Sequence, residues 1–402
     1  MKTKYLGPGE HDWGFVEVRP GAHMFWLLYY TTNSQVSSPY EKPLVIWLQG
    51  GPGGSGTGYG NFAEIGPVDV NLRPRNYTWV KECNVLFIDN PVGAGFSYVD
   101  SEDKYATNNT QIADDLVNLM KSFLEQKPGF RKVPTYIFGE SYGGKMGVEF
   151  ALAWHKNLTS IESNLKGLAL GDASISAPDI MDAWAPFLLQ RGLIDADTSK
   201  AIEEQIVAVK KAMSDKRWRE ANQLYNRVLD FAIEKSNNIS IYNVLEKAGY
   251  DSVSTDLKTV EHFMIEVVKE LLNMGEKQYH IRSSAVYDAL DDCRKPVFNM
   301  VEELLNETDL KVFTYSGEFD FLINSLGTYR WSDKLSWKHA EKWRSSDPIP
   351  IYVNGVIEAW QRTYDKFSFF RILHSGHMAP KDNPAAMLKI LNLMISNSTT
   401  TS

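Results

Sequence analysis

The sequence predicts an α/β fold with a central, mostly parallel sheet that is interrupted by a helical insertion. Over most of the 402 residues, short apolar runs bounded by Gly, Pro and Asp alternate with amphipathic helical patterns. Continuous apolar runs are typical of strands buried on both faces of a parallel sheet, and their alternation with helices indicates the α/β class. Between about residues 178 and 294 this alternation stops, and apolar residues recur at helical spacing among dense charges.

The individual elements follow from these patterns. Trp13–Tyr30 alternates and is rich in aromatic side chains, which predicts an antiparallel meander. The expected buried strands are Leu44–Leu48, Asn84–Ile88, Thr135–Phe138, Gly167–Leu170, Leu310–Tyr315 and Phe367–Leu373. The expected helices are Thr110–Gln126, Lys145–Lys156, Ser199–Met213, Lys216–Glu234 and Leu257–Met274.

These elements divide the chain into three parts. We expect residues 1–177 to form the first part of an α/β core and residues 295–402 to form the second part. Residues 178–294 are expected to form a helical cap over the carboxyl edge of the sheet. The hydrophobic content of 43% is sufficient for a core of this size.

Charge and hydropathy argue against several classes of partner. The net charge of −8 and the pI near 5.6 argue against a nucleic-acid or anionic-membrane partner. No apolar stretch approaches the ~20 residues of a membrane-spanning helix. Met1–Glu10 lacks the apolar core of a signal peptide, which fits a mature or trimmed form or a cytosolic protein.

The cysteines and the N-glycosylation sequons of the chain are relevant to the cellular compartment of the protein. Cys83 and Cys293 could form one disulfide or remain two buried thiols, and the apolar run that Cys83 opens favours a buried free thiol there. Asn-x-Ser/Thr sequons are acceptors for N-glycosylation and favour a secreted or lysosomal/vacuolar location. They occur at Asn76, Asn108, Asn157, Asn238, Asn306 and Asn397.

The strongest chemical motif is a Gly-x-Ser-x-Gly segment placed between a strand and a helix. Thr135–Phe138 leads into Gly139-Glu140-Ser141-Tyr142-Gly143, which is the pattern of the nucleophile elbow of α/β-hydrolases. A sharp strand-to-helix turn exposes a serine hydroxyl and aims the N–H groups of the helix N-terminus at developing negative charge. We interpret Ser141 as a nucleophile; the alternative is a structural glycine-rich turn.

A serine nucleophile needs a base and an orienting carboxylate. In α/β-hydrolases the acid and then the histidine follow the serine along the chain. Glu318 and Asp320 compete for the acid after a late strand, and His374 and His377 compete for the base after the last one. No Cys or carboxylate set with metal-ligand spacing accompanies the two histidines, so we expect no metal and no cofactor.

An oxyanion hole requires an early loop whose backbone approaches the serine closely. The glycine-rich segment Gln49–Gly56 follows the strand Leu44–Leu48 and suits this use. A phosphate-binding loop is the rival interpretation. We set it aside because no Gly-Lys-Ser/Thr closes the segment and no helical pattern follows it.

Taken together, these segments resemble the serine carboxypeptidase family, and most of all its retinoid-inducible branch. The resemblance spans most of the chain and keeps the family's motif order. Gln49 stands where many members have Asn, and Gly54 stands where many have a disulfide-bonded Cys, so that bridge is absent here. The motifs that carry the resemblance are the aromatic meander, Trp47–Gly53, Glu64–Pro67, Asp89–Tyr98, Gly139–Gly143 and Gly376–Pro380.

The resemblance implies a role for each matching residue. Ser141 matches the nucleophile, Asp320 the acid and His377 the base, which leaves Glu318 and His374 as neighbours. The implied oxyanion donors are the backbone N–H groups of Gly51 and Tyr142. The group implied to hold the carboxylate of a substrate's C-terminus is Gln49, Gly50, Glu64 and Glu140.

Two glutamates beside a substrate carboxylate need a physical explanation. If Glu64 and Glu140 lie close together, they should share a proton, because two adjacent buried carboxylates cannot both ionise cheaply. A protonated carboxyl can donate a hydrogen bond to the substrate carboxylate at acid pH. Alternatively, Glu140 merely caps the helix of the elbow.

The implied function is that of a serine carboxypeptidase, which removes single C-terminal residues from peptides at acid pH through an acyl-enzyme. An esterase or acyltransferase could use the same scaffold and the same three residues. A non-catalytic binding protein that has kept the fold is the third hypothesis. The expected partners are peptides with a free C-terminus.

Overall fold

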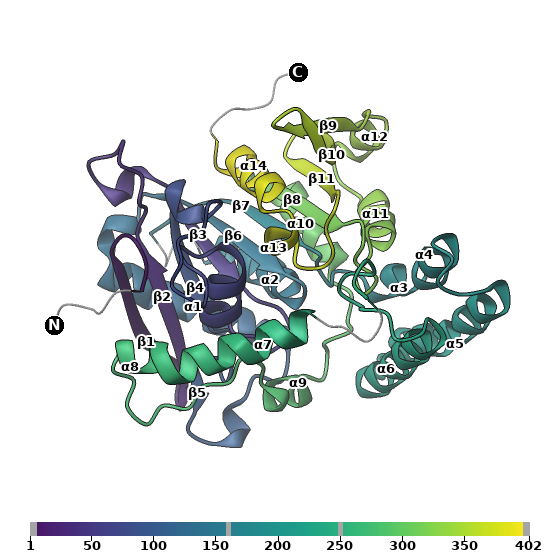
Figure 1. The fold of residues 1–402 in the computed structure, drawn as a ribbon, viewed down its shortest axis with the longest axis horizontal. Coiled ribbons are helices and arrows are strands. Elements are labelled where there is room, and N and C mark those ends of the chain that lie inside the picture. Colours follow the sequence, from purple (N-terminus) through teal and green to yellow (C-terminus); the bar gives the residue numbers. More distant parts are fainter. Residues whose placement is uncertain (1–5, 158–161, 248–251, 397–402) are drawn as a thin grey trace.

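In the computed structural model, the described residues 6–157, 162–247 and 252–396 contain an eleven-stranded sheet (Figure 1). The strand order is β1-β2-β4-β3-β6-β7-β8-β11-β10-β9, with β5 paired to β2. The middle six strands are mutually parallel, which confirms the predicted mostly parallel sheet. They are β3 (Leu44–Leu48), β4 (Asn84–Ile88), β6 (Pro134–Glu140), β7 (Asn164–Gly171), β8 (Lys311–Gly317) and β11 (Phe367–Ile372).

Antiparallel strands extend the sheet on both sides. The predicted aromatic meander is the hairpin of β1 (His11–Arg19) and β2 (Ala22–Tyr29), which pairs with β4 and with the short β5 (Tyr98–Val99). On the other side, β9 (Ile349–Val353) and β10 (Val356–Tyr364) were not expected from the sequence. Most of their residues are half-buried or exposed, so they lack the continuous apolar run by which the buried strands were found.

Helices cover both faces of the sheet. Successive residues of β3 enter different hydrophobic clusters, because side chains alternate across a strand: Val45 lies on one face and Ile46 on the other. On the Ile46 face lie α1 (Asn109–Gln126), α2 (Tyr142–Lys156) and α10 (Phe298–Glu307). On the Val45 face lie η2 (Gly56–Ile65), α7 (Ser252–Phe263) and α14 (Pro384–Ile395).

The helical insertion builds a cluster of its own. Residues from α4 (Trp184–Gln190), α5 (Ala196–Ser214) and α6 (Trp218–Lys235) form a third hydrophobic cluster, to which Phe321 also belongs. These three helices lie at the opposite end of the molecule from the β1–β2 hairpin (Figure 1). The cap predicted as part of the fold is therefore present, whereas the exact limits 178 and 294 stay a prediction. Shorter helices of the same region are α3 (Ala177–Met181), η6 (Met264–Val268), α8 (Lys269–Leu271) and α9 (Ser284–Ala289).

One expectation about the glycine-rich loop is wrong. The loop is followed directly by the π-helix η2, although the sequence shows no helical pattern there. Three glycines hide this helix, and each makes a contact too close for a Cβ. A Cβ would lie 2.5 Å from the Ile88 carbonyl oxygen at Gly56, 1.9 Å from the Tyr279 hydroxyl at Gly58 and 2.2 Å from Trp47 Nε1 at Gly60. Buried Asp89 fixes the first turn by accepting hydrogen bonds from Ser55 Oγ at 2.7 Å and Thr57 N at 3.0 Å. The phosphate-loop interpretation stays set aside, because the segment has no lysine of the Gly-Lys-Ser/Thr kind to contact a phosphate.

Cys83 and Cys293 are both buried free cysteines, as favoured for Cys83. Within the described residues, no helix is long and apolar enough to cross a membrane.

Buried Lys145 joins the elbow helix to the end of the cap. Its Nζ donates to the carbonyl oxygens of Asp292 at 3.1 Å, Cys293 at 2.9 Å and Lys295 at 2.6 Å. Burial lowers the pKa of Lys145 to about 8, which still leaves it charged at acid pH.

Lys145→Met should therefore lower the free energy of unfolding by about 2–4 kcal/mol, because it leaves buried carbonyl groups without their donor. Urea unfolding measures the change. Lys200→Met, on the exposed face of α5, is the matched control and should leave the midpoint unchanged. Equal midpoints for the two variants would contradict the role of the Lys145 contacts.

Candidate active site

Ser141 occupies a strained turn at the carboxyl end of β6. Its backbone has φ 59° and ψ −122°, between the end of β6 at Glu140 and the start of α2 at Tyr142. Such a conformation is costly for a residue with a Cβ and persists only where the surroundings enforce it. Here a Cβ at Gly143 would lie 2.1 Å from the carbonyl oxygen of Leu48, so the turn can form only with glycine at that position.

The glycine-rich loop passes directly beside Ser141. A Cβ at Gly50 would lie 2.6 Å from the Cβ of Ser141, which explains why this position also has to be glycine. Among the hydrogen bonds of the described residues, none uses the N–H of Gly51 or Tyr142 as donor. Both N–H groups therefore remain available, and residues 50, 51 and 142 lie beside Ser141 along one cavity.

His377 and Asp320 form a buried pair. His377 Nδ1 lies 2.6 Å from Asp320 Oδ2, and the exposed fractions of their side chains are 2% and 0%. Asp320 Oδ1 also accepts from the N–H of Ile323 at 3.0 Å. The ring of Tyr242 lies 5.4 Å from that of His377, and the Tyr242 carbonyl accepts from the His377 N–H at 2.7 Å. These contacts fix the ring so that Nε2 is the free nitrogen.

The two competing candidates lie apart from this pair. Glu318 forms an ion pair with Arg371, at 2.7 Å between Oε1 and Nε. His374 is 69% exposed and lies 3.4 Å from Glu358. Neither Glu318 nor His374 lines the cavity that contains Ser141 and His377.

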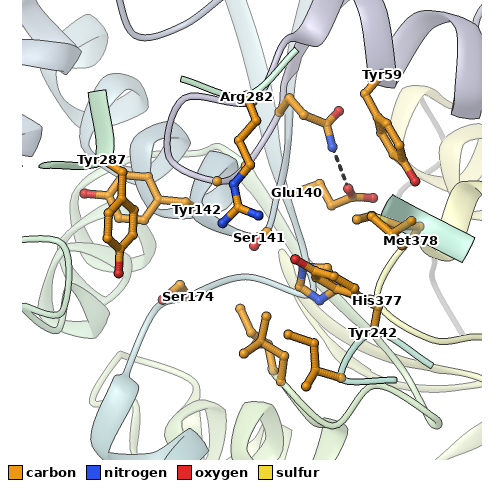
Figure 2. A pocket seen from close by; sticks show the side chains of 18 of the residues that line it. Tyr59, Glu140, Ser141, Tyr142, Ser174, Tyr242, Arg282, Tyr287, His377 and Met378 are labelled. Carbon is orange, nitrogen blue, oxygen red and sulfur yellow. Dashed lines mark hydrogen bonds between the residues drawn. The ribbon is translucent and has the colours of Figure 1, made fainter. Parts of the chain in front are cut away.

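Ser141 and His377 face the same cavity (Figure 2). The described residues contain no hydrogen bond between the Ser141 hydroxyl and the His377 ring. In free enzymes this contact is often long, and it tightens when substrate binds.

Glu140, Gln49 and Glu64 form a buried polar group beside Ser141. Trp47 Nε1 donates to Gln49 Oε1 at 2.7 Å, and this orients Gln49 so that its Nε2 donates to Glu140 Oε1 at 2.7 Å (the dashed line in Figure 2). Both oxygens of Glu64 and Oε2 of Glu140 are buried. None of these three oxygens has a hydrogen-bond partner among the described residues when the carboxyl groups are ionised. A proton held between the two carboxyl groups would satisfy these oxygens.

The electrostatics of the pair agree with such a proton. Burial, and then the neighbouring Glu64 charge, raise the pKa of Glu140 well above its ordinary value. Burial also raises the pKa of Glu64, to about 7. Glu140 and Gln49 line the cavity, whereas Glu64 lies behind them and does not. Any effect of Glu64 on a bound molecule would therefore pass through Glu140.

The cap supplies much of the cavity wall, and sequence reasoning missed these residues. The cavity has a volume of about 350 Å³. Arg282 points toward Ser141 from above, while Tyr287 lies to the side of Tyr142 (Figure 2). Arg294 lies 3.7 Å from the centre of the Tyr225 ring and donates to Asn222 Oδ1 at 2.9 Å. No local motif marks these positions, because they reach the cavity only through tertiary contacts of the cap, such as the β-bridge between Arg282 and Gly54.

A serine on a strained strand-to-helix turn, a buried histidine–aspartate pair and free N–H groups beside the serine are, on this fold, the arrangement of an α/β-hydrolase. Comparison with known proteins narrows this class. A family model described as serine carboxypeptidase matches residues 3–397, and the chain belongs to that family.

Individual relatives support the assignment. The chain is 37% identical to a retinoid-inducible serine carboxypeptidase of Rattus norvegicus, over 96% of this chain and 91% of the relative. It is 32% identical to serine carboxypeptidase-like 51 of Arabidopsis thaliana, over 96% and 92%. The crystal structure of a prohormone-processing carboxypeptidase of Saccharomyces cerevisiae shares the fold with a TM-score of 0.83, at 20% identity and 96% and 90% coverage.

The predicted glycosylation positions differ in accessibility. Asn76, Asn108 and Asn238 are exposed. Asn306 is exposed as well, and its amide donates to the Ser336 carbonyl at 3.1 Å, as that of Asn108 donates to Thr107 Oγ1 at 3.4 Å. Asn157 is half-buried and its amide donates to the Ala153 carbonyl, while Asn397 lies outside the described residues.

The histidine–aspartate pair yields a prediction with two matched controls. Asp320→Asn should lower kcat by about 10⁴-fold, because an amide in place of the carboxylate favours the wrong tautomer of His377. The controls are Glu318→Gln and His374→Gln, which change the competing candidates and should stay near wild-type rate. Steady-state kinetics distinguish the variants, and a comparable loss in Glu318→Gln would reassign the acid.

The raised carboxyl pKa values also predict how stability depends on pH. An acid whose pKa is raised in the folded state stabilises the protein below its ordinary pKa, and this contribution is lost as pH rises through the folded pKa. For Glu64 this window extends from about 4.5 to about 7. The free energy of unfolding of the wild type, relative to Glu64→Gln, should therefore fall between pH 4.5 and 7.

Urea unfolding of both proteins across this range tests the sign. Glu149→Gln is the matched control, since Glu149 is a buried glutamate of α2 that accepts from Asn109 Nδ2 at 2.7 Å. A wild-type advantage that grows with pH would show that Glu64 is ionised in the folded protein.

Proposed function

We propose that this protein releases single C-terminal residues from peptides at acid pH by an acyl-enzyme mechanism, with Ser141, His377 and Asp320 as its catalytic residues. The observation that carries the proposal is the buried Glu64–Glu140 pair beside the serine. An esterase needs a nucleophile and an oxyanion hole, but it has no use for a protonated carboxyl next to them. An exopeptidase that recognises a free C-terminus does.

Binding of the substrate carboxylate follows from this chemistry. At acid pH the Glu140 carboxyl is neutral and can donate a hydrogen bond to the substrate carboxylate. The second N–H of Gln49 Nε2 and the N–H of Gly50 are further donors at the same side of Ser141. Together they place the last peptide bond over the serine and reject substrates that lack a terminal carboxylate.

The reaction then uses the remaining groups in sequence. His377 Nε2 takes the proton of the Ser141 hydroxyl as its oxygen attacks the carbonyl carbon, and Asp320 stabilises the imidazolium that forms. The N–H groups of Gly51 and Tyr142 bind the resulting oxyanion. The imidazolium protonates the leaving amine, which departs as the C-terminal residue. Water, deprotonated by His377, hydrolyses the acyl-enzyme and frees Ser141.

Exposed sequons and the acid-dependent site favour a secreted or lysosomal/vacuolar location. An acidic compartment would keep Glu140 protonated, and four of the sequons have exposed asparagines. Peptides with a free C-terminus are the proposed partners.

The nucleophile can be tested directly. Ser141→Ala should abolish labelling by a fluorophosphonate and lower peptide hydrolysis by about 10⁴-fold or more, since the attacking oxygen is gone. Mass spectrometry of the labelled wild type identifies the modified residue. A folded wild type that does not react with fluorophosphonate would favour a non-catalytic binding protein instead.

The carboxylate site has a distinct pH signature. KM for a peptide with a free C-terminus should rise as the pH increases through the raised pKa of Glu140, because this carboxyl then loses the proton that it donates to the substrate carboxylate. Glu140→Gln keeps a neutral donor at every pH and should remove this rise. Glu149→Gln is the control and should behave as wild type.

Substrate comparison separates the competing enzyme classes. Peptides with an amidated C-terminus should be poor substrates at every pH. If amidated peptides or simple esters are cleaved at acid pH as fast as peptides with a free C-terminus, the proposal of a carboxylate-binding site is wrong. The esterase alternative then gains support.

A further inference from the structure

A third buried acid lies beside the histidine–aspartate pair, and the mechanism above does not use it. Asp172 follows β7 and is fully buried, with 0% exposure. Its backbone has φ 41°, which is unusual for a residue with a side chain, and its N–H donates to the Tyr315 carbonyl at 2.8 Å. A carboxylate oxygen of Asp172, one of Asp320 and a ring nitrogen of His377 all lie within 4.8 Å of one another.

The two oxygens of Asp172 have different surroundings. Oδ1 accepts hydrogen bonds from the Gly317 N–H at 2.8 Å and the Ser316 hydroxyl at 3.2 Å. Oδ2 is buried and has no partner that donates to it among the described residues. An unpartnered carboxylate oxygen in the interior is costly, whereas a protonated oxygen there can itself donate.

Asp172, and not Asp320, has a buried oxygen that receives no hydrogen bond, so a proton shared by the two carboxyl groups belongs on Asp172. Both Asp320 oxygens accept hydrogen bonds, from the Ile323 N–H and from His377 Nδ1. Two adjacent buried carboxylates cannot both ionise at low cost. Burial, and then the charge of Asp320, raise the pKa of Asp172 well above its ordinary value. The other titratable groups near Asp172 are Glu140 and Tyr315.

We propose that Asp172 is a positioning residue whose neutral carboxyl donates its Oδ2 hydrogen to the Asp320 carboxylate. This hydrogen bond spreads the negative charge of Asp320 and weakens its hold on the His377 imidazolium. His377 therefore gives up its proton more readily and can act as a base at lower pH. The proposal rests on the proposed function in so far as His377 is the base.

Two variants separate this role from a structural one. Asp172→Asn keeps an acceptor for Gly317 and places an amide donor where the O–H was. In a plot of kcat/KM against pH, it should leave the rise on the acid side (the acid limb) unchanged. It should also leave kcat within about 3-fold of wild type. Asp172→Ala removes the donor, so Asp320 holds the imidazolium proton more strongly. Its acid limb should move up by about one pH unit, with about a tenfold loss on that limb.

The rate of Ser141 labelling by a fluorophosphonate should be measured across the same pH range. This rate depends on His377 and not on which substrate the enzyme accepts, so it separates failure of the inference from failure of the carboxypeptidase proposal. Asp179→Asn is the control, because Asp179 is a buried aspartate of α3 that accepts from Ser176 Oγ at 2.5 Å. It is not one of the three proposed catalytic residues. It should leave the acid limb unchanged.

Two outcomes would overturn the inference. If Asp172→Asn moves the acid limb to lower pH, a negative charge has been removed and Asp172 is ionised in the enzyme. If Asp172→Asn and Asp172→Ala share the wild-type limb, Asp172 only supports the fold. Near-UV circular dichroism confirms that each variant is folded, and the Nδ1 proton resonance of His377 gives a second readout. This resonance should be retained in Asp172→Asn and shifted in Asp172→Ala.

Discussion

The site depends on close contact between the end of β3 with the loop that follows it and the turn that leads from β6 into α2. A Cβ at residue 143 would lie 2.1 Å from the carbonyl oxygen of Leu48, at the end of β3, and a Cβ at residue 50 would lie 2.6 Å from the Cβ of Ser141. Ser141 has its positive φ at this contact, and Gly51 and Tyr142 line the same cavity as Ser141. Any side chain at residue 50 or 143 would push the glycine-rich loop Gln49–Gly56 away from Ser141.

The same convergence of strand ends concentrates acids in a dry environment. Glu140 ends β6, Asp172 follows β7 and Asp320 follows β8, and all three are fully buried. Because these strands are adjacent and parallel, their carboxyl groups crowd together and repel one another when ionised. Protons on some of them relieve this repulsion. The fold therefore favours low pH before any substrate is considered.

Local signals in the sequence predicted what short stretches of chain determine. The elbow around Ser141 and the six buried strands depend on neighbouring residues, and they were found. The exposed strands β9 and β10 were missed, because alternation on a half-exposed surface resembles a loop. The helix η2 was missed because its glycines serve packing, as the contact at Gly60 shows. Arg282 and Arg294 enter the cavity through the tertiary packing of the cap, which leaves no local trace.

The two acid pairs differ in where the proton acts, and this difference determines whether substrate binding or chemistry is lost first as the pH rises. In the Glu64–Glu140 pair the proton faces the cavity through Glu140, so a ligand competes for it directly. In the Asp172–Asp320 pair the proton is sealed behind His377 and can reach a ligand only by altering the basicity of the imidazole. A rise in pH would thus weaken binding of the substrate carboxylate first, while the base remained competent. Loss of binding rather than loss of chemistry would then set the upper pH limit of activity.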